Sequence, residues 1–130
     1  MASAAGGRLA QALAGTDMHQ PVATYTQDDF QRVLEREFPP AIRADVIPIL
    51  ERYGQEKWQL AQLRVRMACL KLARGSVTKL QEYVSVACRD PRDVLSWAEY
   101  SNYGRAQSAE ERSKAIAMDW AEVQEWLHRS

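Results

Sequence analysis

The stretch Gln55–Arg74, QEKWQLAQLRVRMACLKLAR, decides the fold. Apolar residues recur in it every three or four positions and form two adjoining stripes, a pattern typical of a helix that is contacted from more than one side. One stripe begins at Trp58, and the other contains Met67 and Leu70. We therefore expect a central helix over residues 55–74.

Signals for helix ends divide the rest of the chain. Thr26, Ser76, Asp90 and Ser108 each precede a helical pattern and can cap it, and the Pro39-Pro40 pair ends the first helix. No run of alternating polar and β-branched residues predicts a strand. The sequence predicts an all-α fold: a compact bundle of five or six helices in one domain over residues 26–130. Residues 1–25 are expected to form a flexible or weakly helical arm.

One expected helix, over residues 41–53, contains a proline. Pro48 lies either near the start of this helix, after a cap at Asp45, or at a kink within it. In the last expected helix, Ile116, Trp120, Val123 and Leu127 follow at spacings of four, three and four residues. We expect this face to pack on the other helices.

Composition restricts the classes of partner. Seventeen Lys and Arg balance seventeen Asp and Glu, so no global field attracts nucleic acid or an anionic membrane. No apolar stretch approaches the roughly 20 residues that span a bilayer. Cys69 and Cys88 lie among apolar residues without a CxxC or Cys/His cluster, which predicts buried, reduced thiols, with a disulfide between them left open. We expect a cytoplasmic protein.

Residues for catalysis are sparse. The two histidines, His19 and His128, lie in the N-terminal arm and near the C-terminus. Many carboxylates fall at helix starts, where capping explains them, and no Glu-x-x-His pair or glycine-rich phosphate motif is present. The sequence predicts no enzyme, no metal and no cofactor. An enzyme would have to rely on carboxylates in a concave pocket.

The segment Arg64–Tyr100, RVRMACLKLARGSVTKLQEYVSVACRDPRDVLSWAEY, resembles a family of small uncharacterised bacterial proteins. The resemblance is carried by the KLARG turn, the Lys79-Leu80 pair and the closing RDVLSWAEY. Asp119-Trp120 and Trp126-Leu127 add a similar terminal pattern. The resemblance implies an all-α fold and no assigned activity.

A candidate partner-binding surface follows from residue type. Arg, Trp and Tyr dominate protein interfaces, and they gather between positions 89 and 103. The predicted contact residues are Arg89, Arg92, Trp97, Glu99, Tyr100 and Tyr103. In the alternative interpretation Trp97, three residues after Val94, belongs to the core, with Arg92 and Glu99 paired outside it. The same two interpretations, core or interface, are open for Trp58, Trp120 and Trp126. We expect a module that binds another protein, either a different chain or a second copy in a homo-oligomer.

Nucleic-acid binding is the alternative function. Lys57, Arg64 and Lys71 recur every seven residues, which would align them on one helix face. A weak phosphate-binding strip would use Arg64, Arg66, Lys71, Arg74 and Lys79. The zero net charge favours a solvated face with salt links to other helices.

Overall fold

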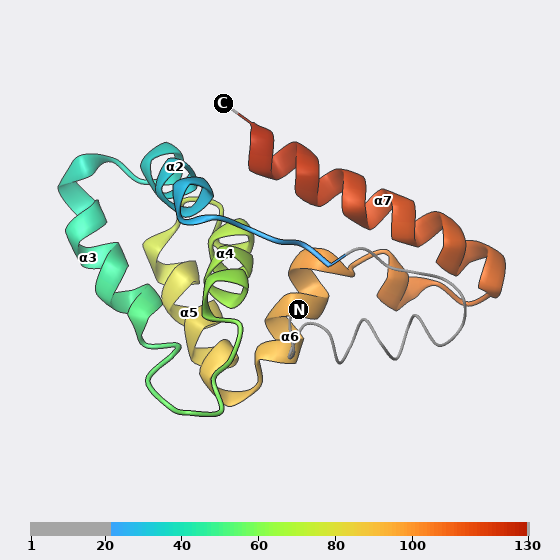
Figure 1. Cartoon of the computed structure of the whole chain (residues 1–130), viewed down its shortest axis with the longest axis horizontal. Helices are drawn as coiled ribbons and strands as arrows, with labels where there is room; N and C mark the ends of the chain where they lie inside the picture. The colour runs from blue at the N-terminus through green and yellow to red at the C-terminus, as the bar shows by residue number, and fades with distance from the viewer. Residues whose placement is uncertain (1–21, 130) are drawn as a thin grey trace.

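The computed structural model describes residues 22–129 (Figure 1). This part of the chain has six α-helices, one short 3-10 helix and no strand. In chain order they are α2 (Gln27–Glu37), α3 (Pro40–Glu51), α4 (Gln62–Ala73), α5 (Val77–Arg89), α6 (Pro91–Glu99), η1 (Tyr103–Arg105) and α7 (Ala109–His128). The predicted all-α bundle is confirmed. Most of the predicted arm, with His19, lies outside the described residues, and residues 22–26 are not helical.

The central element is α4. It packs against α5, α6 and α2. Val65, Met67, Cys69 and Leu70 are each at most 1% exposed. These side chains point to several sides of the helix, so both predicted stripes contribute to the core. Each large apolar side chain buried in this way contributes roughly 1.5–3 kcal/mol to folding.

The start predicted for the central helix is wrong. The helix begins at Gln62 rather than Gln55, and residues 52–61 form a loop between α3 and α4. Ala61, just before the helix, has left-handed backbone angles (φ 54°, ψ 47°), which cannot continue a right-handed helix. Trp58, expected in the buried stripe, is 52% exposed.

The predicted caps are confirmed. Thr26 Oγ1 accepts from the Asp29 amide at 3.0 Å, and the Thr26 amide donates to Asp29 Oδ2 at 3.0 Å. Ser76 and Asp90 likewise accept from backbone amides at the starts of α5 and α6. Ser108 does the same for α7. Each such cap satisfies an amide that would otherwise lack a partner in the helix.

Helix α3 differs in detail from the prediction. It begins at Pro40, directly after the Pro39 N-cap, and Pro48 lies inside it. A proline fits the first helical position because its missing N–H would be unpaired there. The cap proposed at Asp45 is therefore not used as a helix start, and Pro48 lies at an interior position.

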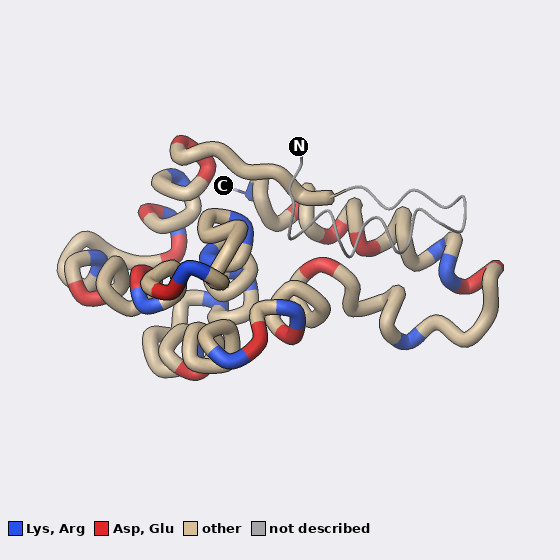
Figure 2. Tube along the Cα trace, turned by 60° about the horizontal axis from the view of Figure 1, so that its bottom comes forward, with Lys and Arg blue, Asp and Glu red and all other residues tan. Residues whose placement is uncertain are grey.

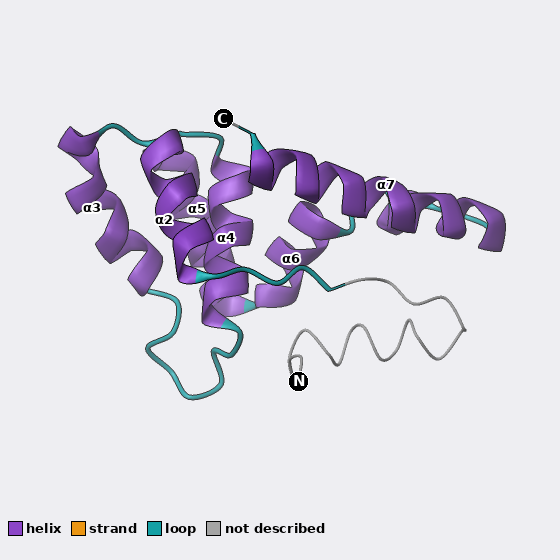
Figure 3. Cartoon of the chain, turned by 45° about the horizontal axis from the view of Figure 1, so that its top comes forward, coloured by secondary structure: helices purple, strands orange, loops and turns teal. Residues whose placement is uncertain are grey.

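Helix α7 runs along one edge of the molecule, and its first half extends beyond α6 (Figure 3). Its last turns reach the core, where Val123, Trp126 and Leu127 are buried. Trp120, predicted on the packed face, is 36% exposed. The expected face is thus buried towards the C-terminal half of α7, where the helix meets the bundle.

Side chains of α2 fix the end of α7. Arg32 Nη1 donates to the Leu127 carbonyl at 2.6 Å, and Arg36 Nη1 donates to the Trp126 carbonyl at 2.8 Å. The Arg36 guanidinium also lies 5.4 Å from the centre of the Trp126 ring. These contacts satisfy carbonyls at a helix C-terminus, which otherwise lack intrahelical partners.

Acidic and basic residues are interspersed along the helices (Figure 2). None of the helices in residues 22–129 is both long enough and apolar enough to span a bilayer. Both thiols are free. Cys69 is buried as predicted, whereas Cys88 is only half-buried; it lies near the end of α5, and its thiol donates to the Arg52 carbonyl at 3.6 Å.

Candidate functional site

The loop of residues 52–61, here called the Trp58 loop, reverses the usual placement of polar and apolar side chains. Gln59 is 4% exposed, while its neighbours Trp58 and Leu60 are 52% and 51% exposed. Isolated apolar residues on a surface are ordinary, but two large ones flanking a buried amide are not. Departures of this kind from local rules are expected at functional or strained sites, which makes the loop a candidate.

Hydrogen bonds hold the Trp58 loop in one shape. Gln59 Oε1 accepts from the Gly54 amide at 2.7 Å and from the Glu56 amide at 3.1 Å. Tyr53, 1% exposed, donates its hydroxyl to the Leu60 carbonyl at 2.7 Å. Gln59 therefore takes the place of the backbone partners that a helix would have supplied.

Neighbouring helices also fix the loop. Arg66 on α4 donates through Nε to the Leu50 carbonyl at 3.1 Å and through Nη2 to the Tyr53 carbonyl at 2.7 Å. Gly54 has φ 115°, and a Cβ there would lie 2.9 Å from Arg66 Nη2. Ala61 keeps its left-handed backbone in spite of a Cβ. Backbone strain of this kind is retained where surrounding contacts impose it, commonly at functional sites.

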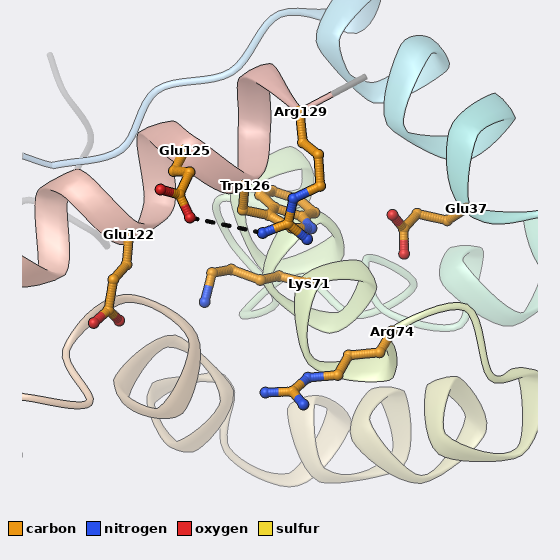
Figure 4. Close-up of a pocket in the computed structure, with 7 residues that line it drawn as sticks. All are labelled: Glu37, Lys71, Arg74, Glu122, Glu125, Trp126 and Arg129. Atoms are coloured by element: carbon orange, nitrogen blue, oxygen red, sulfur yellow. Dashed lines mark ion pairs between the residues drawn. The ribbon is translucent and has the colours of Figure 1, made fainter.

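A second candidate site is a hollow of about 500 Å³ where the ends of α2, α4 and α7 meet (Figure 4). Its walls carry three acidic and three basic residues beside an aromatic ring. The lining residues are Glu37, Lys71, Arg74, Glu122, Glu125, Trp126 and Arg129. An enzyme without a catalytic histidine would need a concave pocket lined by carboxylates, and this hollow has three glutamates. Each of the three carboxylates, however, has a polar partner inside the protein.

The predicted contact surface between positions 89 and 103 is not continuous. Glu99 and Tyr100 are 6% and 5% exposed, so they cannot serve as surface contacts in this fold. Arg64 binds Glu99 through Nε and Nη2, and its Nη2 also donates to the Tyr100 hydroxyl at 3.0 Å. The expected pairing of Glu99 with Arg92 is wrong, because Arg92 lies outside the core and binds Asp90.

Burial and pairing have opposite effects on this Arg64 cluster. Burial is the largest single effect on the pKa of Arg64 and lowers it, but the hydrogen bond and charge of Glu99, together with Tyr100, outweigh burial and raise the pKa. Burial also raises the pKa of Tyr25, which lies near Glu99 and Arg64. The cluster is therefore an internal ion pair with phenol neighbours, and it joins α4 to α6.

Other predicted contact residues do lie at the surface. Trp97 is 47% exposed and meets Tyr83 edge-on, with ring centres 6.1 Å apart, so the core interpretation of Trp97 is not supported. Arg89 and Arg92 are exposed, and Tyr103 is half-buried at η1. The six predicted contact residues therefore do not form one surface. What lies at the surface instead is the aromatic pair of Tyr83 on α5 and Trp97 on α6.

The predicted basic strip is divided by the fold. Arg64 is buried with Glu99, and Arg66 is engaged by carbonyls of Leu50 and Tyr53. Lys71 and Arg74 line the hollow between α2, α4 and α7, while Lys79 is exposed on α5. Two of the five cations are therefore unavailable to a phosphate backbone.

Sequence reasoning also missed Asp119. This carboxylate is 2% exposed and accepts from the Asn102 amide at 2.9 Å and the Tyr103 amide at 3.0 Å. It fixes the start of η1 against α7. The sequence offered one hint, because Asp119 lies in the middle of a helix, where capping does not explain an acid.

Within residues 22–129, no group of three or more His, Cys, Asp or Glu side chains is placed to hold a metal ion. No family model, curated protein or solved structure matches the chain. The resemblance to a bacterial family through the KLARG and RDVLSWAEY segments stays a prediction.

Proposed function

We propose that this chain is a protein-interaction module without catalytic activity, and that the Trp58 loop is its principal contact. The observation that carries the proposal is the exposure of Trp58 and Leu60 on either side of the buried Gln59. Tryptophan is among the residues that most often dominate binding energy. Because the loop is already fixed by internal bonds, little ordering entropy opposes its association.

The chemistry of the loop suggests the kind of partner. Trp58 and Leu60 fit an apolar groove on another folded protein, and the exposed Glu56 and Lys57 beside them suit a polar rim. The partner is either a different protein or a second copy of this chain. We also propose a cytoplasmic location, which the two free thiols support.

The test compares single alanine variants of the whole chain. Proteins recovered with the immobilised wild-type chain are identified by quantitative mass spectrometry, and the affinity of each purified candidate is then measured. Trp58→Ala should weaken the binding of a true partner at least about tenfold, as expected for an interface hot spot. Trp120→Ala is the matched control, because Trp120 is an exposed tryptophan on α7.

Two further measurements make the result decisive. Thermal unfolding should be nearly unchanged by Trp58→Ala, since half of this side chain is already exposed. Sedimentation of the wild type and of Trp58→Ala detects the case in which the partner is a second copy. If neither the binding of a recovered protein nor self-association depends on Trp58, the proposal is wrong. Binding that depends on Trp97 alone would instead place the contact surface at the exposed aromatic pair of α5 and α6.

The nucleic-acid alternative receives less support, because Arg64 and Arg66 are engaged inside the protein. It predicts binding to oligonucleotides that falls steeply with salt. The same preparations can be titrated with duplex and single-stranded DNA. Salt-dependent binding that Lys79→Gln weakens would favour this alternative.

A further inference from the structure

The hollow between α2, α4 and α7 contains charges of both signs, and each acid in its lining has a polar partner within the protein, as does Arg129. Glu37 Oε2 accepts from Arg36 Nε at 3.0 Å, and Glu122 Oε2 accepts from Asn102 Nδ2 at 3.0 Å. Glu125 Oε1 faces Arg129 Nη2 at 3.9 Å. Each of the three carboxylates in the lining therefore has a polar partner within the protein.

Two of the cations have none. Among the described residues, neither the half-buried Lys71 nor the exposed Arg74 has a hydrogen bond or an ion pair through its side chain. Both side chains extend into the hollow in Figure 4. Burial lowers the pKa of Lys71, against the opposing effect of Glu122, so the ammonium is held where water solvates it incompletely. Lys71 and Arg74 thus present hydrogen-bond donors to the hollow that no described side chain or carbonyl accepts.

The helix dipole explains why cations lie at the end of α4, but it does not provide them with hydrogen-bond acceptors. A cation in the last turn is favoured by the helix dipole, and Lys71 is in the last turn of α4. The dipole acts on charge and supplies no acceptor to the Lys71 ammonium or the Arg74 guanidinium. A bound oxyanion would supply an acceptor to the half-buried Lys71, and the exposed Arg74 lies at the same end of α4.

We propose that the hollow binds a small molecule through a carboxylate or phosphate group placed between Lys71 and Arg74. A guanidinium can bind two oxygens of such a group side by side, and an ammonium adds a third bond. A volume of about 500 Å³ accommodates a small metabolite, with Trp126 as an aromatic wall.

The glutamates define the selectivity of this site. Glu122 and Glu125 face the hollow from α7, and Glu37 faces it from α2. Like charges disfavour a polyanion, so a single oxyanion is preferred to a chain of phosphates. The site therefore differs in chemistry from a nucleic-acid surface, although it uses two of the same cations.

The test is calorimetric titration of the whole chain with inorganic phosphate and with succinate, in a chloride buffer. Saturable binding of at least one probe is expected. The probe that binds identifies phosphate or carboxylate as the group recognised. Lys71→Gln and Arg74→Gln should each weaken binding at least tenfold, while Arg74→Lys should weaken it less because the charge is kept. Lys79→Gln and Arg92→Gln are the matched controls, since both cations are exposed outside the hollow.

Several outcomes would overturn the proposal. One is the absence of saturable binding by either probe; another is equal binding by the Lys71→Gln/Arg74→Gln double variant, with its fold checked by circular dichroism. A third is tighter binding of a single-stranded oligonucleotide than of either probe, with that binding dependent on Lys71 and Arg74. Trp58→Ala should bind the probes as the wild type does, so this inference and the proposed function can fail separately.

Discussion

Arg64 on α4 and Glu99 on α6 form a buried ion pair, with Arg64 Nε 3.0 Å from Glu99 Oε1. Their side chains are 7% and 5% exposed. The pair lies 35 positions apart in the sequence and closes α6 onto the central helix. Removing one member would leave the other charge buried without a counter-charge.

Glu99→Gln tests this relationship, because it removes the charge and keeps the shape. We expect a loss of about 3–5 kcal/mol in the free energy of unfolding, measured by urea denaturation. Asp90→Asn is the control: it removes a charge from the exposed Asp90 to Arg92 pair and keeps a good capping residue, so it should cost at most about 1 kcal/mol. Equal losses in the two variants would contradict the structural role of the buried pair.

Gly54→Ala should destabilise the protein by about 1–3 kcal/mol. Gly54 has φ 115°, and an added Cβ would lie 2.9 Å from both Arg66 Nη2 and Gln62 Cδ. Gly104→Ala is the matched control, because a Cβ at Gly104 meets nothing within 4 Å. Urea midpoints of the two variants provide the comparison. A neutral Gly54→Ala would mean that the Trp58 loop is not held as described.

Asp119→Ala should free the start of η1. The variant removes the acceptors of the Asn102 and Tyr103 amides, and we expect a loss of about 2 kcal/mol or more. Hydrogen exchange should accelerate at these two amides. Glu122→Ala removes one bond to the Asn102 side chain and should leave both amides protected. Unchanged exchange in Asp119→Ala would exclude this role for the carboxylate.

The cap of α2 should depend on pH. The hydrogen bond from the Thr26 amide holds the pKa of Asp29 below its usual value of 3.8. A depressed pKa means that the folded state favours the ionised carboxylate, so the stabilisation is present above pH 3.8 and is lost as the pH falls through the folded pKa. Asp29→Asn should cost about 1 kcal/mol at pH 7 and progressively less on acidification. A cost that does not change with pH would contradict the assignment.

The two thiols should differ in reactivity. Burial raises the pKa of Cys69 to about 12, and a buried thiol is protonated and inaccessible at neutral pH. Cys88 is half-buried at the end of α5. Ellman's reagent should therefore modify one thiol in the native protein and two after unfolding in urea. Cys88→Ser should remove the fast reaction, and reaction of both thiols at one rate would disprove the distinction.

Local chemistry made most of the fold predictable. Thr26, Ser76, Asp90 and Ser108 mark helix starts because each side chain satisfies amides within its own first turn. Apolar spacing marked the buried faces because it depends on helix geometry alone. Such signals act over a few residues and need no knowledge of the remaining chain.

The candidate sites depend on partners distant in sequence. Trp58 lies at a spacing compatible with the stripe of α4, but the left-handed backbone of Ala61 and the bonds from the Gly54 and Glu56 amides to the buried Gln59 side chain place it outside the helix. The hollow with Lys71 is assembled from three helices. Its residues show no local pattern, so sequence spacing could not predict it.

The hydrogen bonds from Arg32 and Arg36 to the last carbonyls of α7 affect the cooperativity of unfolding. These bonds connect positions 90 to 95 residues apart, so the outermost helices of the described chain stabilise each other directly. Opening of α2 is thereby coupled to fraying of the C-terminal end of α7, and the two helices are expected to open as one unit instead of two independent ones.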